Sequence, residues 1–135
     1  MNMQTPESDI QKTEIAVWLT VSSSELAAEY YMTAFRTQEL YRLENDNGKL
    51  ELAQLSVNGA NFWISEDPEF TPEMASRGSI RMIMTVKDPD SVFDQAVAAG
   101  ATIINPILEE YGWRIGRIVD PFGYHWEIGK KVDSM

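Results

Sequence analysis

The residues with the clearest chemical potential lie near the C-terminus, in the run Asp120-Pro121-Phe122-Gly123-Tyr124-His125-Trp126-Glu127-Ile128. Proline presets φ and glycine tolerates positive φ, so Asp120 to Gly123 predicts a tight turn, followed by a strand that begins near Tyr124. Side chains alternate between the two faces of a strand. His125 and Glu127 are therefore expected on one face, where they could bind a metal, move a proton or orient a polar ligand, and Trp126 is expected in the core with Phe122 in the turn packing.

Composition narrows the chemistry that these residues could perform. The 135 residues include no cysteine, which excludes disulfides, thiolate metal ligands and a thiol nucleophile. A net charge of -10, without a dense lysine and arginine cluster, argues against nucleic acid as a partner. The same acidity would favour a cationic ligand, although it serves equally to keep a protein soluble. No apolar run reaches the ~18 residues of a membrane span and no signal peptide is recognisable, so we expect a cytoplasmic protein without a membrane partner.

The first half of the chain predicts one βαβββ unit. Residues 1–13 are polar and aperiodic, and we expect a disordered tail there. Ser22-Ser23-Ser24-Glu25 has the capping-box spacing of a helix start, and apolar residues at helical spacing continue to Phe35. Alternating apolar residues and turn signals predict the strands 15–21, 39–44, 50–57 and 61–65. Module one therefore spans 15–66, and residues 67–79, which hold two prolines, form a linker.

The second half repeats this order of elements. Asp88-Pro89 predicts a helix start and Gly100 its end, within a module that spans 80–129. Its strands are predicted at 80–86, 102–107, 114–120 and 124–129. Ile80, Thr85 and Val86 repeat Ile15, Thr20 and Val21 at an offset of 65 residues. The modules form one domain over 14–130, and each helix covers one sheet face, leaving the opposite face to line a cleft.

The C-terminal run and the preceding Tyr111-Gly112-Trp113-Arg114 resemble the signature of the glyoxalase/bleomycin-resistance (vicinal oxygen chelate) superfamily, most closely its PhnB-like branch. The resemblance covers roughly residues 14–130. It implies an α+β fold in which two βαβββ modules form a curved mixed sheet around a cleft. It also implies a homodimer, in which modules pair within one chain or between chains.

The resemblance further implies four metal-ligand positions, which fall on Ala16, Trp63, Arg81 and Glu127. Glu127 is the only retained ligand, and His125 is a weak second. A catalytic divalent site needs about three protein ligands, so we expect no metal cofactor, with a divalent metal as the alternative. A guanidinium pairs well with a carboxylate, and we expect an ion pair between Arg81 and Glu127 where the metal would be.

The remaining face residues predict a small-molecule site without an identified catalytic residue. The inward face is expected to carry Ala16 and Ile83. The residues expected to bind the ligand are Trp18, Thr20, Trp63, Ser65, Arg81, Thr85, His125 and Glu127 on this face and Tyr111, Trp113 and Arg114 at its rim. The two face tryptophans could stack on an aromatic or cationic ligand, or could instead pack in a dimer interface. We therefore expect a small-molecule-binding protein. The alternatives are a metal-dependent lyase, isomerase or dioxygenase, and an antibiotic-sequestering resistance protein.

Overall fold

The structure, a computed structural model, describes residues 14–77 and 80–132. The expected tail at 1–13 lies outside these ranges. The elements follow the order β1 (Val17–Val21), α1 (Ser24–Phe35), β2 (Gln38–Glu44), β3 (Leu50–Val57), β4 (Ala60–Glu66), α2 (Pro72–Ser76), β5 (Met82–Thr85), α3 (Pro89–Ala99), β6 (Thr102–Glu110), β7 (Trp113–Val119) and β8 (His125–Lys131). Within the described ranges, no helix is long and apolar enough to cross a membrane.

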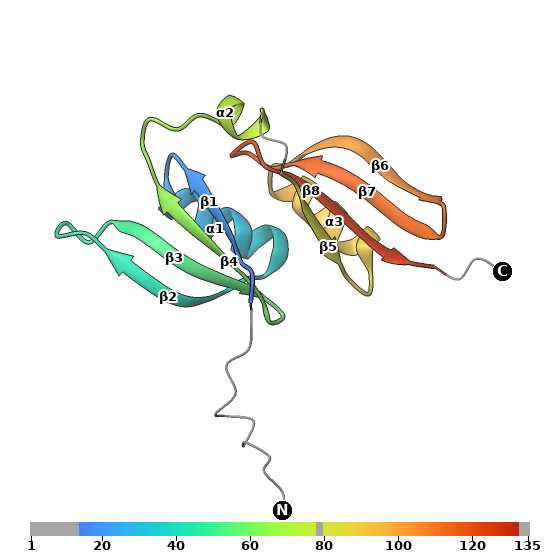
Figure 1. The fold of residues 1–135 in the computed structure, drawn as a ribbon, viewed down its shortest axis with the longest axis horizontal. Helices are drawn as coiled ribbons and strands as arrows, with labels where there is room; N and C mark the ends of the chain where they lie inside the picture. Colours follow the sequence, from blue (N-terminus) through green and yellow to red (C-terminus); the bar gives the residue numbers. More distant parts are fainter. Residues whose placement is uncertain (1–13, 78–79, 133–135) are drawn as a thin grey trace, which may run out of the picture.

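Each module forms its own four-stranded mixed sheet (Figure 1). The first sheet has the order β1-β4-β3-β2 and the second has the order β5-β8-β7-β6. In both sheets the first strand of the module pairs in parallel with the last, and the other neighbours are antiparallel. The expected α+β fold with two βαβββ modules is confirmed, and its curved sheet surface is made by two separate sheets.

Several element boundaries differ from the sequence-based expectation. The strand predicted from Ile15 begins at Val17, because Val17 is the first residue of β1 that has a partner on β4. The strand β6 continues to Glu110, since its pairing with β7 extends to Trp113. The predicted linker contains the short helix α2, which begins after Thr71, whose side chain accepts a hydrogen bond from the Met74 amide.

Helix starts follow the predicted chemistry with one change of partner. Asp88 caps α3 and Gly100 ends it, as expected. The N-cap of α1 is Ser23, whose Oγ accepts from the Leu26 amide at 3.2 Å. The carboxylate that completes this start comes from Glu66 on β4, which accepts from the Ser24 amide at 3.0 Å. The expected capping box with Glu25 is therefore replaced by a contact from Glu66 on β4.

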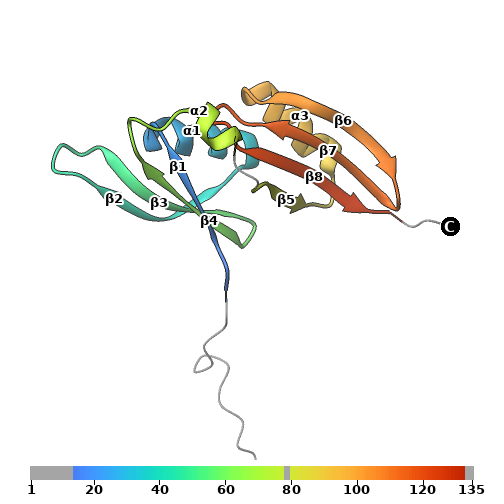
Figure 2. The same cartoon turned by 45° about the horizontal axis from the view of Figure 1, so that its top comes forward.

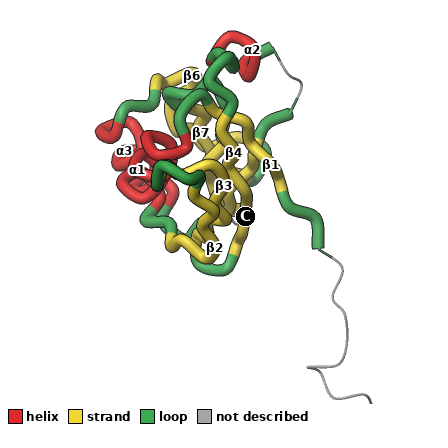
Figure 3. Tube along the Cα trace, turned by 90° about the vertical axis from the view of Figure 1, so that its left-hand side faces the viewer, coloured by secondary structure: helices red, strands yellow, loops and turns green. Residues whose placement is uncertain are grey.

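The two long helices lie together on one side of the molecule and the two sheets lie on the other (Figure 3). Helix α1 packs on β3 and β4, α3 packs on β6, β7 and β8, and the two helices contact each other. Each sheet therefore has one face buried under a helix and one face that no element of the described chain covers. We call these uncovered surfaces the open faces of sheet one (β1 to β4) and sheet two (β5 to β8).

One aromatic core joins the modules. Trp126, on the helix side of β8, is 3% exposed and packs with its ring centroid 4.8 Å from that of Phe35 and 5.6 Å from that of Phe62. Both phenylalanines belong to module one, so this tryptophan buries its large apolar surface between the two modules. The expected core position of Trp126 is confirmed.

The Asp120 turn ties the two modules together through polar contacts. Asp120 is 4% exposed, and its Oδ1 accepts from the amides of Phe122 at 2.9 Å and Tyr124 at 3.0 Å. Its Oδ2 accepts from the Tyr31 hydroxyl at 2.5 Å and from Trp126 Nε1 at 2.8 Å. Burial raises the pKa of the Asp120 carboxyl, and these hydrogen bonds act in the opposite direction. Tyr31 lies on α1, so the turn of module two is anchored in module one.

Two further contacts hold the same turn in place. The Tyr124 hydroxyl donates to the Thr20 carbonyl at 2.6 Å and accepts from the Thr20 amide at 3.0 Å, which satisfies backbone groups of the edge strand β1. The Ser76 hydroxyl at the end of α2 donates to the Gly123 carbonyl at 2.9 Å. Figure 2 shows α2 close to the start of β8, where this turn lies. The linker helix is therefore seated on the turn that precedes the candidate site.

Candidate ligand cleft

The open face of sheet one carries an aromatic surface. Trp18 on β1 and Trp63 on β4 are direct neighbours across the parallel pair, and their rings stack with centroids 6.2 Å apart and an interplanar angle of 24°. Tyr41 on β2 meets Trp63 edge-on, with centroids 6.0 Å apart. Trp18 Nε1 donates to Ser65 Oγ at 2.8 Å, which fixes the orientation of that ring. Trp18, Trp63 and Tyr41 form the aromatic shelf, of which Trp18 is 56% exposed.

The open face of sheet two carries charged groups instead. Its β5 residues lie beside β8, with Ile83 opposite Glu127, and Arg81 directly precedes β5. Arg81 Nε forms an ion pair with Glu127 Oε2. The predicted pair between these residues is confirmed. The Glu127 side chain is 19% exposed and that of Arg81 is 49% exposed, so the carboxylate lies deeper than the arginine that neutralises it.

A second contact on this face involves Arg117, which sequence reasoning missed. Arg117 on β7 lies opposite Glu127 on β8, and its Nε donates to His125 Nδ1 at 3.1 Å. Desolvation by burial, followed by the nearby charge of Arg117, lowers the pKa of His125, so the neutral imidazole is favoured. Because alternate residues of a strand share a face, Arg117 lies on the same face as Trp113, and this alternation could have identified it from the sequence.

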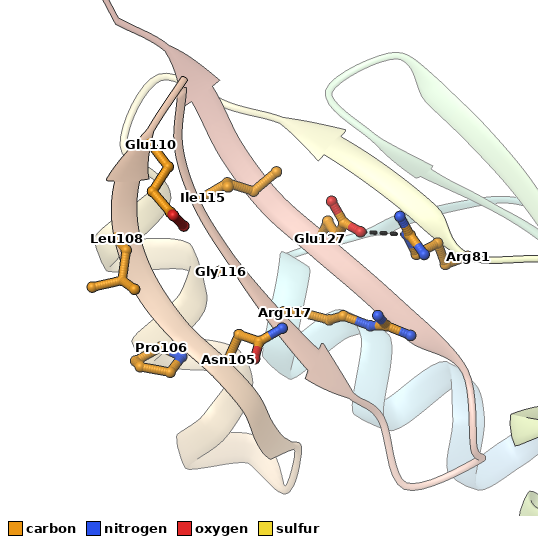
Figure 4. A pocket seen from close by; sticks show the side chains of 9 residues that line it. All are labelled: Arg81, Asn105, Pro106, Leu108, Glu110, Ile115, Gly116, Arg117 and Glu127. Atoms are coloured by element: carbon orange, nitrogen blue, oxygen red, sulfur yellow. Dashed lines mark ion pairs between the residues drawn. The ribbon is translucent and has the colours of Figure 1, made fainter. Parts of the chain in front are cut away.

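A pocket of about 430 Å³ occupies the same open face (Figure 4). The pocket is lined by Arg81, which directly precedes β5, and by residues of sheet two. These are Asn105, Pro106, Leu108, Glu110, Ile115, Gly116, Arg117 and Glu127. The Arg81–Glu127 pair and Arg117 lie toward one end in Figure 4, whereas Glu110 lies toward the other. The apolar side chain of Ile115 lies between the charged ends, and that of Leu108 lies beside it on the outer strand β6. This arrangement suits a small organic molecule with one polar end.

The predicted site residues do not all lie together. Trp18, Thr20, Trp63 and Ser65 lie on sheet one, and Thr85 follows Ile83 on the open side of β5. Tyr111 and Trp113 lie at the far end of the β6–β7 hairpin, where Tyr111 is 96% exposed with φ of +53°. Arg114 points to the helix side, where its Nη2 meets Asp90 Oδ2 at 2.6 Å. The structure therefore separates Arg114 from the open face that it was predicted to rim.

The four superfamily positions do not fit a divalent metal. Ala16 has no ligating atom, Trp63 belongs to the aromatic shelf, and Arg81 directs a permanent cation at Glu127. Across residues 14–77 and 80–132, no three histidine, aspartate or glutamate side chains come together as a ligand set. The donor chemistry at these positions is that of an ion pair.

Comparison with known proteins relates the chain to bacterial sequences. No family model matches it. An uncharacterized Mycobacterium bovis protein, Mb0911c, is 33% identical over 122 residues, which cover 84% of this chain and 80% of that protein. The Mycobacterium tuberculosis protein Rv0887c is also 33% identical over 122 residues, covering 84% and 72% of the two chains. These matches are long enough to show common family membership.

Solved structures share the fold at lower identity. TioX from Micromonospora sp. ML1 is 23% identical with a TM-score of 0.71, over 90% of this chain and 100% of that one. A PhnB protein from Bacillus cereus is 19% identical with a TM-score of 0.66, over 90% and 100% of the two chains. A bleomycin-binding protein, solved with bleomycin, is 15% identical with a TM-score of 0.66, over 89% and 99%. The chain therefore belongs to the same family as the mycobacterial proteins and shares the fold of these three solved structures.

Proposed function

We propose that this protein is a cytoplasmic, small-molecule-binding homodimer that works without a metal. The observation that carries the proposal is the pairing of Arg81 with Glu127 beside a pocket, at positions where the superfamily resemblance implies metal ligands. A binding site of this kind needs apolar surface and a few directed polar groups, and the open faces carry both. No side chain is assigned a catalytic role.

The aromatic shelf supplies the main apolar contact. Its two tryptophans present flat rings on one surface, and Trp18 is more than half exposed. A planar ligand that stacks on such rings gains about 0.5–1.5 kcal/mol per ring beyond the burial of its area. A cationic ring would gain a comparable amount from the faces of the indoles. The shelf therefore favours planar aromatic ligands.

Replacing Trp63 by leucine is expected to weaken the binding of quinoline and N-methylquinolinium about three- to tenfold, because one stacking surface is lost. Tryptophan fluorescence quenching measures both affinities. Trp63→Phe is the matched control, since it keeps a ring at the same position and should retain most of the affinity. Equal affinities in Trp63→Leu and the unchanged protein would place the ligand elsewhere and remove the shelf from the proposal.

Metal content gives an independent test. After incubation with Ni, Zn, Mn or Fe(II) and desalting, we expect less than about a tenth of an equivalent per chain, because a divalent site needs about three ligands and Glu127 supplies one. Elemental mass spectrometry measures this ratio. About one equivalent that is lost in Glu127→Gln would contradict the proposal and support the metal-dependent lyase, isomerase or dioxygenase.

A second candidate function is the sequestration of an antibiotic. The stacked tryptophans and the net charge of -10 favour a planar cationic drug, and a bleomycin-binding protein shares the fold. Quenching of tryptophan fluorescence by bleomycin at micromolar concentration would support this function. The absence of a response at ten times that concentration would leave the small-molecule proposal with another ligand class.

The homodimer is proposed from the apolar side chains on the open faces. Ile83 is 64% exposed on the open face of sheet two, outside the lining of the pocket, and a second copy could cover it while leaving the aromatic shelf and the pocket open between the chains. We expect sedimentation velocity to give about twice the 15.3 kDa of one chain. Ile83→Glu should shift the protein to monomer, whereas Leu26→Glu, on an exposed part of α1, should not. A monomeric unchanged protein would exclude this assembly.

A further inference from the structure

We infer that Arg117 forms an anion subsite, which receives a carboxylate or phosphonate group of the ligand in the pocket of sheet two. This inference deepens the proposed function and depends on it. The surrounding charge makes such a subsite unexpected, since the chain has 21 acidic residues against 11 lysines and arginines. If Arg117 pairs with no carboxylate of the described residues, its local surroundings must explain why.

Arg117 is half-buried, yet no carboxylate pairs with it within the described ranges. Arg114, three residues earlier and also half-buried, is bound by Asp90 and Glu109. A half-buried guanidinium loses hydration, and a carboxylate normally compensates that loss. At Arg117 no carboxylate of the described residues supplies this compensation, and we assign it to an anionic group of the ligand.

Arg117 lines the pocket, and its contacts engage only part of its guanidinium. Its Nε is engaged by His125 Nδ1 at 3.1 Å, while its two terminal amino groups have no hydrogen-bond partner among the residues that the structure describes. A guanidinium fixed through Nε presents its remaining donors as a fork that matches a carboxylate or phosphonate. Glu127 does not take this position, because Arg81 already neutralises it.

The rest of the pocket gives the ligand a direction. Asn105 lies opposite Arg117 on the neighbouring strand and adds an amide at the cationic end. Leu108 and Ile115, which are direct neighbours across β6 and β7, can contact an apolar body. Glu110 lines the opposite end and would repel an anionic group there. The pocket thus favours a molecule with an apolar body and one anionic end placed at Arg117.

The test compares four probes of one shape: benzoate, phenylphosphonate, benzyl alcohol and benzylammonium. Isothermal titration calorimetry in a phosphate-free buffer is expected to show an anionic probe binding about tenfold more tightly than benzyl alcohol, with benzylammonium weakest. Arg117→Gln should remove this preference, and Arg117→Lys should keep part of it because the charge remains without the fork. Arg114→Gln is the matched control and should keep the preference intact. The tighter of benzoate and phenylphosphonate identifies the anionic group.

Three results would overturn the inference. Benzyl alcohol binding as tightly as both anions would remove the subsite and leave small-molecule binding standing. An equal loss of preference in Arg114→Gln would assign the effect to general charge. Failure of all four probes to bind at millimolar concentration, with quinoline still quenching tryptophan, would also reject the subsite alone. Failure of quinoline as well would reject the proposed function.

Discussion

Replacing Gly123 by alanine is expected to lower the free energy of unfolding by roughly 2–5 kcal/mol. Gly123 has φ of +94°, in the left-handed region, and a Cβ at this position would lie 2.0 Å from the Pro72 carbonyl oxygen. The backbone conformation accounts for about 1–2 kcal/mol of the loss and the clash for about 1–3 kcal/mol. Because Pro72 opens α2, a Cβ here would push the linker helix off the turn.

Gly59→Ala is the matched control for this prediction. Gly59 has nearly the same φ, +93°, but a Cβ there would meet no atom within 4 Å. Gly59→Ala should therefore lower the free energy of unfolding only by the contribution of the backbone conformation, about 1–2 kcal/mol. The difference between the two variants measures the contact between α2 and the turn. Urea denaturation gives both values. Equal losses in the two variants would show that α2 is not seated on Gly123 in solution.

The local chemistry of the sequence was sufficient to predict most elements. Asp88, Pro89 and Gly100 bound α3 as expected, because capping and φ preferences act within a few residues. The start of α1 was less predictable, since Glu66, which accepts from its first amide, lies 42 residues away. The five-residue helix α2 was missed because one turn and a half carries no measurable periodicity.

The candidate site was predictable in part for a related reason. Strand alternation places His125 and Glu127 on one face and Trp18 and Trp63 on another, but it does not say how two sheets are arranged. The superfamily positions singled out Arg81 and Glu127, which do pair. They passed over Arg117, which occupies no such position and which only the pairing of β7 with β8 brings opposite Glu127.

Asp120→Asn is expected to destabilise the protein by roughly 2–4 kcal/mol, because all four hydrogen bonds to this side chain come from donors. An asparagine keeps one accepting oxygen for the amides of Phe122 and Tyr124, and turns its NH₂ toward Tyr31 and Trp126. The Tyr31 hydroxyl can rotate to accept a hydrogen bond. The Trp126 indole can only donate. Its N–H would therefore face the NH₂ of the asparagine, and this buried pair of donors would have no acceptor between them.

The effect of this substitution should depend on Tyr31. In Tyr31→Phe the NH₂ of an asparagine has no acceptor at all, so we expect Asp120→Asn to cost about 0.5–3 kcal/mol more there than in the unchanged protein. Asp67→Asn is the control, since Asp67 accepts from the Glu69 amide in an exposed turn and should change stability by about 0.5 kcal/mol or less. Urea denaturation of the four variants measures the cycle. A cost at Asp120 no larger than at Asp67 would mean that water reaches the carboxylate, and that the two modules are held together by the aromatic core around Trp126 without help from the turn.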